Sequence, residues 1–135
     1  MNNKRVLVAD DELHIREVIS YKLQIAGLEV ITAHDGSEAL ELAKSESPDL
    51  LIVDYQMPGL NGLEVCLGLG EEPRTSRIPA IMLTARGLDI EQAELEQARI
   101  NVVIAKPFSP RKVLSCVKEL LRQEEAEVGA ENVRK

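Results

Sequence analysis

Five short runs of aliphatic residues alternate along the chain with longer stretches in which apolar residues recur every three or four positions. Each run has the length and composition of a strand buried on both faces, and the stretches between have the period of helices that bury one side. The predicted strands cover residues 4–9, 28–32, 50–53, 79–83 and 102–105. The alternation predicts an α/β domain with a mostly parallel sheet, and right-handed crossovers place helices on both of its faces.

Residues with special backbone preferences mark the predicted helix ends. Gly27 closes the first helix in a left-handed conformation. Ser37 is the predicted N-cap of the second helix, which cannot extend past Pro48. Ser109 and Pro110 are the predicted N-cap and first residue of the last helix.

The helix predicted over residues 89–98 has the weakest apolar pattern of the five. Ile90, Ala93 and Ala98 face one way on a helical projection. Leu95 points away from this stripe. We therefore expect this helix to be the least firmly packed.

The 135 residues are enough for one domain with a proper core. No apolar run approaches the ~20 residues that span a bilayer, and the N-terminus leads straight into a strand, so we expect a cytoplasmic protein without a membrane segment. Cys66 and Cys116 lie within apolar helical patterns and are predicted as buried thiols without a disulfide. The polar, acid-rich residues 123–135 are expected to fray as a tail.

The charge balance and the aromatic content argue against a nucleic-acid partner. A formal net charge of -7 does not suit phosphate neutralisation, which needs clustered Lys and Arg. The only aromatic residues are Tyr21, Tyr55 and Phe108, too few for a base-stacking platform.

Chemically active side chains follow four of the five predicted strands. They are Asp10 and Asp11 after the first, Asp54 after the third, Thr84 after the fourth and Lys106 after the fifth. The carboxyl ends of parallel strands share one edge of the sheet, where ligands bind in such folds. Taken singly, each residue has a plainer explanation as a solvated turn, a cap or a surface charge. Their joint occurrence predicts one site.

The types of side chain in this set indicate phosphoryl chemistry. Converging carboxylates repel one another and stay ionised only with a cation among them, and hard oxygen ligands at a partly open site suit Mg²⁺. Lys106 and Thr84 can grip phosphoryl oxygens from the other side. The central carboxylate, Asp54, can then act as the nucleophile that forms an aspartyl phosphate.

The order and spacing of these motifs resemble the response-regulator receiver domains of bacterial two-component signalling. The matching motifs are Asp10-Asp11, Asp54 with Met57-Pro58 and Gly62, Thr84-Ala85, and Lys106-Pro107-Phe108. The resemblance covers residues 4–122. It implies a five-stranded doubly wound parallel sheet of order 2-1-3-4-5, the flavodoxin-like order.

The resemblance also implies roles for the individual residues. Asp54 matches the phosphoacceptor and would bind Mg²⁺ together with Asp11 and the backbone carbonyl of Gln56. Asp10 would act on the ion largely through water. Thr84 matches the hydroxyl that contacts the phosphoryl group.

Lys106 matches the cationic partner of the phosphoryl group in that family. The family has a cis bond between this lysine and the following proline, which here is Pro107. Gln56 and Arg86 match variable positions beside the path of the attacking water and are expected to set the lifetime of the phosphorylated state. The family acts as a signalling module with self-dephosphorylation and is not a conventional enzyme.

Two departures from the family pattern concern signal output. Val103 stands where the family usually has Tyr or Phe, so a switch that rotates an aromatic ring is not expected. Arg99 replaces the usual glycine after the fourth helix, and we expect that helix end to be built differently because a left-handed residue other than glycine is costly.

The expected partners are a sensor histidine kinase or a phosphotransfer protein, and a downstream protein that the sequence does not name. The kinase-side partner is expected to contact Leu13, His14 and Phe108. The chain is expected to be a monomer or a weak homodimer. It is either a stand-alone regulator or the receiver part of a longer protein.

Two other functions compete with this interpretation. An aspartyl-phosphate phosphatase of the haloacid dehalogenase type also uses Asp, Thr and Lys at strand ends, but the segment from Asp10 to Leu13 lacks its Asp-x-Asp-x-Thr spacing. A binding scaffold that works without phosphorylation is the second alternative, and the complete acidic set argues against it.

Overall fold

The computed structural model describes residues 4–85 and 89–133, with side chains up to residue 125. Five parallel strands form one sheet in the order β2-β1-β3-β4-β5, as predicted. The strands are β1 Arg5–Ala9, β2 Glu29–Ala33, β3 Leu50–Asp54, β4 Ala80–Ala85 and β5 Val102–Lys106. The α/β class and the order 2-1-3-4-5 are therefore confirmed.

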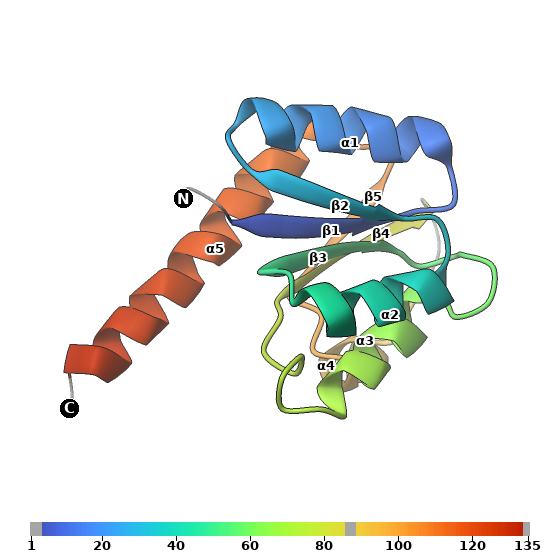
Figure 1. The fold of residues 1–135 in the computed structure, drawn as a ribbon. Helices are drawn as coiled ribbons and strands as arrows, with labels where there is room; N and C mark the ends of the chain where they lie inside the picture. Colours follow the sequence, from blue (N-terminus) through green and yellow to red (C-terminus); the bar gives the residue numbers. More distant parts are fainter. Residues whose placement is uncertain (1–3, 86–88, 134–135) are drawn as a thin grey trace.

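Five helices cover the two faces of the sheet (Figure 1). They are α1 Leu13–Ile25, α2 Gly36–Glu46, α3 Gly62–Gly70, α4 Gln92–Gln97 and α5 Pro110–Val133. Helices α1 and α5 lie on one face, and α2, α3 and α4 lie on the other (Figure 1). In the described part of the chain, no helix combines the length and the apolar character that crossing a membrane requires.

The sheet divides the core into two clusters because successive side chains of a strand point to opposite faces. Leu51 and Val53 of β3 belong to the cluster under α2 and α3, whereas Leu50 and Ile52 belong to the cluster under α1 and α5. Every residue of β3 is buried. Burial of each large aliphatic side chain contributes about 1.5–3 kcal/mol, so this central strand is held firmly from both sides.

The start of α2 differs from the prediction. The N-cap is Asp35, not Ser37, and Asp35 Oδ1 accepts a hydrogen bond of 2.8 Å from the backbone N–H of Glu38. Gly36 already has helical geometry, so the cap lies one residue before it. The start of α5 agrees with the prediction, because its first residue is Pro110.

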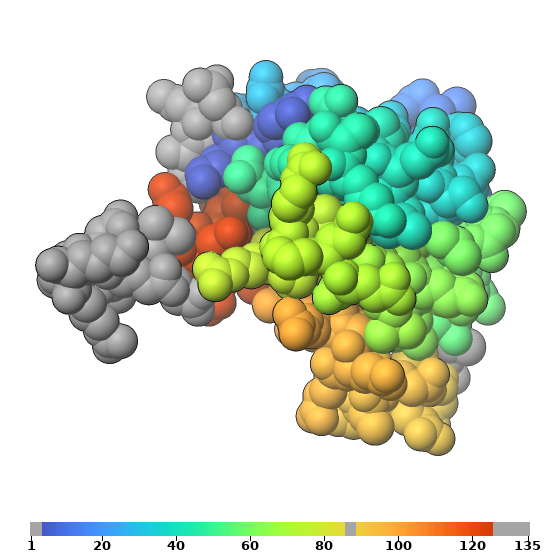
Figure 2. Space-filling model, turned by 60° about the horizontal axis from the view of Figure 1, so that its bottom comes forward, coloured from blue at the N-terminus to red at the C-terminus, as the bar shows by residue number. Residues whose placement is uncertain are grey.

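The interpretation of α4 needs two corrections. The helix spans Gln92–Gln97, shorter than the predicted 89–98. Ile90 and Ala98 pack against the core as predicted, but Leu95 is also partly buried against it while Ala93 is exposed, so these two positions were wrongly assigned. The expected weak packing agrees with a helix that contains no buried residue and that, in yellow-orange, stands out from α3 in Figure 2.

The chain leaves α4 through the same hydrogen-bond pattern as it leaves α1. After α1, Gly27 has φ +92° and the N–H of Leu28 donates to Leu23 O at 3.1 Å. After α4, Arg99 has φ +60° and the N–H of Ile100 donates to Leu95 O at 3.1 Å. At each end a second bond runs from the left-handed residue itself, from Gly27 N–H to Gln24 O and from Arg99 N–H to Glu96 O. The expectation of a different helix end was wrong, because a cap with these two bonds requires a left-handed residue whatever its side chain.

Helix α5 is longer than predicted. It continues to Val133, through most of the segment 123–135 that was expected to fray, and its second half extends past the edge of the sheet in Figure 1. The segment contains four Glu and two Ala, residues that favour helix even without tertiary contacts. The proposed domain boundary at residue 122 stays a prediction.

Candidate functional site

The strand pairing brings the predicted site residues to one edge of the sheet. Asp10 directly follows β1, and Asp54 is the last residue of β3, which pairs beside it. Thr84 lies one position beyond Leu83, the residue of β4 that pairs with Asp54. Lys106 ends β5 and pairs with the last residue of β4. The four strands that carry these side chains are adjacent in the sheet and end at the same level.

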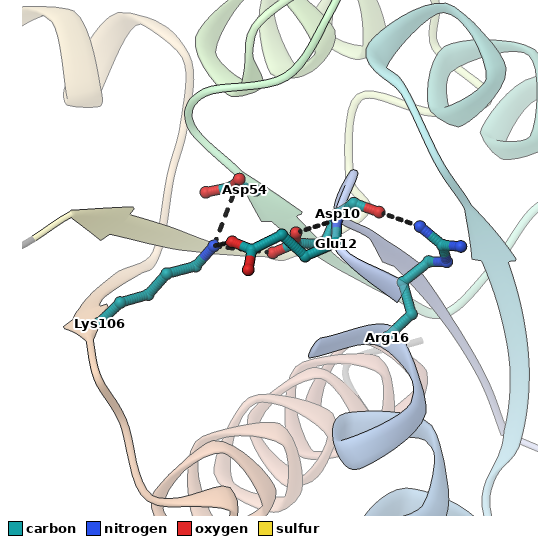
Figure 3. A network of polar contacts seen from close by, with 5 residues as sticks. All are labelled: Asp10, Glu12, Arg16, Asp54 and Lys106. Carbon is teal, nitrogen blue, oxygen red and sulfur yellow. Dashed lines mark hydrogen bonds and ion pairs between the residues drawn. The ribbon is translucent and has the colours of Figure 1, made fainter. Parts of the chain in front are cut away.

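Lys106 is the centre of the polar contacts at this edge (Figure 3). Its Nζ lies 3.0 Å from Asp10 Oδ2 and 3.4 Å from Asp54 Oδ2. It also lies 3.4 Å from Glu12 Oε1, a contact that the sequence did not predict. One ammonium group therefore serves three carboxylates, of which Asp10 and Asp54 are buried and Glu12 is exposed.

The turn after β1 is held by hydrogen bonds to Asp10. Asp10 Oδ1 accepts a bond of 2.9 Å from the backbone N–H of Glu12, which closes a local side-chain turn. Arg16 Nη1 donates a bond of 2.7 Å to the backbone carbonyl of Asp10. Sequence reasoning missed Arg16. Its signal was a cation near the start of a helix, where the helix dipole disfavours positive charge.

Burial and mutual repulsion change the protonation of the site. Burial, together with the charges of Asp10 and Asp11, raises the pKa of Asp54 from 3.8 to about 6, although Lys106 opposes the shift. Burial also raises the pKa of Asp10. Burial lowers the pKa of Lys106, but its contact with Asp10 and the charges of Asp54 and Glu12 outweigh that effect and raise it overall. Lys106 thus stays charged at neutral pH.

The residues of this edge fit a hard divalent cation. Oxygen atoms of Asp10, Asp11 and Glu12 lie within 4.8 Å of one another. Asp10 Oδ2 is fully buried and accepts no hydrogen bond of normal geometry among the described residues, although the charge of Lys106 lies close to it. A buried carboxylate oxygen in that condition is costly unless a cation or water completes it. Three carboxylates and a partly open site match the preferences of Mg²⁺.

An open cleft of about 590 Å³ lies beside this cluster. It is lined by Asp11, Gln56 and the loop between β3 and α3, including Gly59 and Asn61. Gln56 is exposed, so its side chain is accessible from solvent. The cleft thus lies along Asp11 and the residues that directly follow Asp54.

The remaining predicted residues lie at or near the same edge. Thr84 is buried, and within the described residues its hydroxyl forms no side-chain hydrogen bond. The bond between Lys106 and Pro107 is cis, as the resemblance implied. Arg86 lies outside the described residues.

The residues predicted to contact partners differ in exposure. Leu13 is 59% exposed at the start of α1, and His14 beside it is also exposed. Phe108 is partly buried and packs against the core under α1 and α5. Val103 is 42% exposed on β5, so its side chain faces outward in this structure.

Comparisons with known proteins agree with this geometry. A family model for the response regulator receiver domain matches residues 6–118. The chain is 41% identical to the alkaline phosphatase synthesis transcriptional regulatory protein PhoP of Bacillus subtilis and 37% identical to the phosphate regulon transcriptional regulatory protein PhoB of Rhizobium meliloti. These matches cover 91% and 92% of this chain but only 50% and 55% of the relatives. The chain thus spans about half the length of the curated relatives it matches.

Solved structures show the same fold over nearly the whole chain. The chemotaxis response regulator CheY4 of Vibrio cholerae is 32% identical with a TM-score of 0.81, covering 87% of this chain and 98% of that one. A CheY-like receiver domain protein of Methanospirillum hungatei is 28% identical with a TM-score of 0.83, covering 93% and 99%.

Receiver domains are signalling modules rather than conventional enzymes, so the phosphatase alternative finds no support. The adjacent strand ends, the lysine that joins two buried carboxylates and the family match over residues 6–118 agree with one another. The chain belongs to the response-regulator receiver domains of two-component signalling.

Proposed function

We propose that Asp54 accepts a phosphoryl group from a sensor histidine kinase or a phosphotransfer protein. The observation that carries this proposal is the position of Lys106, whose Nζ lies 3.4 Å from Asp54 Oδ2 at a buried strand end. A lysine at that distance from a nucleophilic carboxylate is placed to bind the oxygens of an incoming phosphoryl group.

The transfer exchanges one bond to phosphorus for another. A carboxylate oxygen of Asp54 forms a bond to phosphorus while the bond from phosphorus to the imidazole nitrogen of the donor breaks, and the electron pair stays on that nitrogen. Lys106 neutralises charge on the phosphoryl oxygens, and the hydroxyl of Thr84 donates a hydrogen bond to one of them. Asp54 must be ionised to attack, so its protonation state controls the step.

The cation proposed for this site is Mg²⁺. Asp11 and Asp54 would hold it with their carboxylates, Gln56 would add its backbone carbonyl, and Asp10 would act on it largely through water. Bound there, Mg²⁺ would neutralise charge on the phosphoryl oxygens. The donor set supports this assignment, because hard oxygen atoms of Asp10 and Asp11 lie together at the edge of the sheet where β3 ends with Asp54.

The lifetime of the phosphorylated state is proposed to depend on the residue at position 56. Gln56 is exposed beside the open cleft, where its amide can orient a water molecule toward the phosphoryl group. Dephosphorylation of the isolated protein would then be slower in Gln56→Ala. An unchanged rate would remove Gln56 from the mechanism.

The kinase-side partner is proposed to dock over the start of α1 near the site. Leu13, an apolar residue that is 59% exposed, supports this placement. Leu13→Glu should slow transfer from the cognate kinase while labelling by acetyl phosphate stays normal. Equal transfer rates would place the contact elsewhere.

Labelling with acetyl phosphate tests the central proposal. Intact mass measurement should find one added phosphoryl group in the presence of Mg²⁺ and none in excess chelator, and peptide mapping should assign it to Asp54. Asp54→Asn should abolish the adduct. Asp89→Asn is the matched control, because Asp89 is exposed and should be labelled as the wild type is. Labelling that persists in Asp54→Asn or in chelator would overturn the assignment.

A further inference from the structure

The turn between β1 and α1 carries a cation that the proposed chemistry does not use. Arg16 lies in the first turns of α1, and its Nη1 donates a hydrogen bond of 2.7 Å to the backbone carbonyl of Asp10. Figure 3 shows Arg16 reaching back to Asp10 from the side opposite to Lys106. The two cations therefore approach the same acidic turn in different ways.

Arg16 contacts the backbone of this turn and not its carboxylates. Among the described side chains, Arg16 forms no ion pair within 4.0 Å, whereas Lys106 forms three in this region. A guanidinium group bonded to a carbonyl fixes the direction of that carbonyl. Because the peptide unit is planar, this also fixes where the chain continues into Asp11. Arg16 thus acts on the conformation of the turn and not directly on the charge of a ligand.

Other bonds in the turn depend on the same peptide orientation. The N–H of Glu12 donates to Asp10 Oδ1 at 2.9 Å, and Glu12 O in turn accepts the backbone N–H of Arg16 at 3.1 Å. These bonds hold both ends of the Asp10–Glu12 segment against the first turn of α1. The carboxylate oxygens of the segment lie within 4.8 Å of one another. Their convergence costs electrostatic energy, so the turn must be held in place for the cluster to persist.

We infer that Arg16 is a positioning residue for the cation site. Its hydrogen bond to the Asp10 carbonyl holds the carboxylates of Asp10 and Asp11 in the arrangement that binds a divalent cation. This inference rests on the proposed Mg²⁺ site. It assigns to that site an arginine outside the set of expected ligands.

The sign of the effect separates positioning from simple electrostatics. Removal of a positive charge beside an acidic cluster would by itself strengthen the binding of a divalent cation. Loss of a group that orients the ligands weakens metal binding, typically 10–100-fold. The inference therefore predicts weaker binding when the arginine charge is removed, the opposite of the purely electrostatic result.

Titration calorimetry of the metal-free protein with Mg²⁺ tests this difference. Arg16→Met removes the donor and the charge but keeps an unbranched apolar stem. We expect its Kd for Mg²⁺ to rise roughly tenfold. Lys22→Met is the matched control, because it removes a cation from the last turn of the same helix, far along α1 from the acidic turn. Its Kd should stay within about twofold of the wild-type value, because salt screens a partly exposed charge at that distance from the site.

Amide hydrogen exchange provides a second measurement without metal. The N–H of Glu12 is bonded to Asp10 Oδ1 in the ordered turn, so it should exchange faster in Arg16→Met while core amides of β3 keep their rates. If Arg16→Met does not fold, Arg16→Lys takes its place. It keeps the charge but lacks the planar fork of donors, and weaker Mg²⁺ binding is again expected.

The outcomes distinguish the two proposals. Wild-type protein that does not bind Mg²⁺ would contradict the proposed cation site itself. Wild-type binding together with equal or tighter binding by a folded Arg16 variant would overturn the positioning role and leave the cation site standing. Weaker binding that is matched by Lys22→Met would also overturn it, because the loss would then not depend on the contact between Arg16 and the acidic turn.

Discussion

Lys106 Nζ lies 3.4 Å from Asp54 Oδ2, so the proposed nucleophile has a direct cationic partner in the buried site. Lys106 divides its charge between this carboxylate and Asp10, whose Oδ2 lies 3.0 Å away. One cation for two buried carboxylates leaves the site short of positive charge. Burial, together with this shortage of positive charge, explains why the pKa of Asp54 is raised to about 6 in spite of the lysine.

The first prediction concerns the cost of ionised Asp54. Its pKa is about 6 in the folded protein against an ordinary value of 3.8, so the folded state binds this proton more tightly than the unfolded state does. The resulting stabilisation is present below pH 3.8 and is lost as pH rises through about 6. In excess chelator, Asp54→Asn should therefore be more stable than the wild type at pH 8, by about 3 kcal/mol.

Urea unfolding at pH 4 and pH 8 checks this expectation. The difference between Asp54→Asn and the wild type should be small at the lower pH, where Asp54 is mostly protonated in the folded protein. Addition of Mg²⁺ at pH 8 should stabilise the wild type more than the variant. An Asn variant that is less stable than the wild type at pH 8 would contradict the raised pKa.

The second prediction concerns the loss of the lysine. Lys106→Met removes the cation that lowers the pKa of both Asp10 and Asp54, so both pKa values should rise further. Groups with raised folded-state pKa values destabilise the protein as pH increases, and the variant should lose about 2 kcal/mol at pH 8 but less at pH 5. The Lys106 side chain is 19% exposed, so we expect less than the full cost of breaking a completely buried pair.

Chemical denaturation at the two pH values measures this effect. Lys118→Met is a suitable control, because Lys118 is exposed on α5 and its loss should have no such pH dependence. An equal loss of stability at pH 5 and pH 8 for Lys106→Met would mean that lost packing, and not charge, dominates.

The third prediction uses the left-handed residue after α4. Arg99 has φ +60°, a conformation that costs a residue with a Cβ roughly 1–2 kcal/mol relative to glycine. Glycine adds entropy to the unfolded chain, which offsets part of the gain. Arg99→Gly should therefore raise the free energy of unfolding by about 0.5–1 kcal/mol.

Arg99→Ala serves as the control for this change. It also removes the weak bond of 3.4 Å from Arg99 Nη1 to Ser76 O, but it keeps the conformational cost. It should not be more stable than the wild type. Equal stabilisation by alanine and glycine would assign the effect to the arginine side chain and not to the backbone.

The fourth prediction concerns signal output. Val103 is 42% exposed on β5 and has a single, stiff χ1 angle, so it offers no ring that can move inward. We expect the phosphoryl mimic beryllofluoride, added with Mg²⁺, to perturb amides mainly near Asp54, near Thr84 and in the weakly packed α4. Val103 should keep its rotamer, and Val103→Ala should preserve phosphorylation-dependent partner binding. A rotamer change at Val103 observed by NMR would refute this.

Much of the fold and the site follows from local patterns. The aliphatic runs predicted all five strands, because a strand buried on both faces needs apolar side chains in succession. Asp54 and Lys106 directly follow two such runs, and parallel strands end at one edge, so their convergence could be predicted without coordinates. The cap at Gly27 was predictable for a different local reason, since few residues other than glycine readily adopt a backbone conformation with positive φ.

Other features depend on contacts between segments that the sequence does not encode locally. The orientation of α4 is set by the packing of Leu95 on the core, which overrides a weak helical pattern. Arg99 adopts a left-handed conformation because the chain must turn there into β5, and the cap bonds and the partial burial of Ile100 outweigh a cost of about 1–2 kcal/mol.

In the acidic turn, some features follow from the local sequence and others only from tertiary contacts. Sequence alone determined that Asp10 and Asp11 would lie at the sheet edge, because their place after a buried strand leaves no other position. Only the tertiary structure decided that Arg16 would bind the Asp10 carbonyl and that Glu12 would share Lys106 with Asp10 and Asp54. Those contacts depend on the path of the turn into α1 and on the end of β5, 94 residues from Glu12 along the chain. Distances of that kind are set when the sheet assembles.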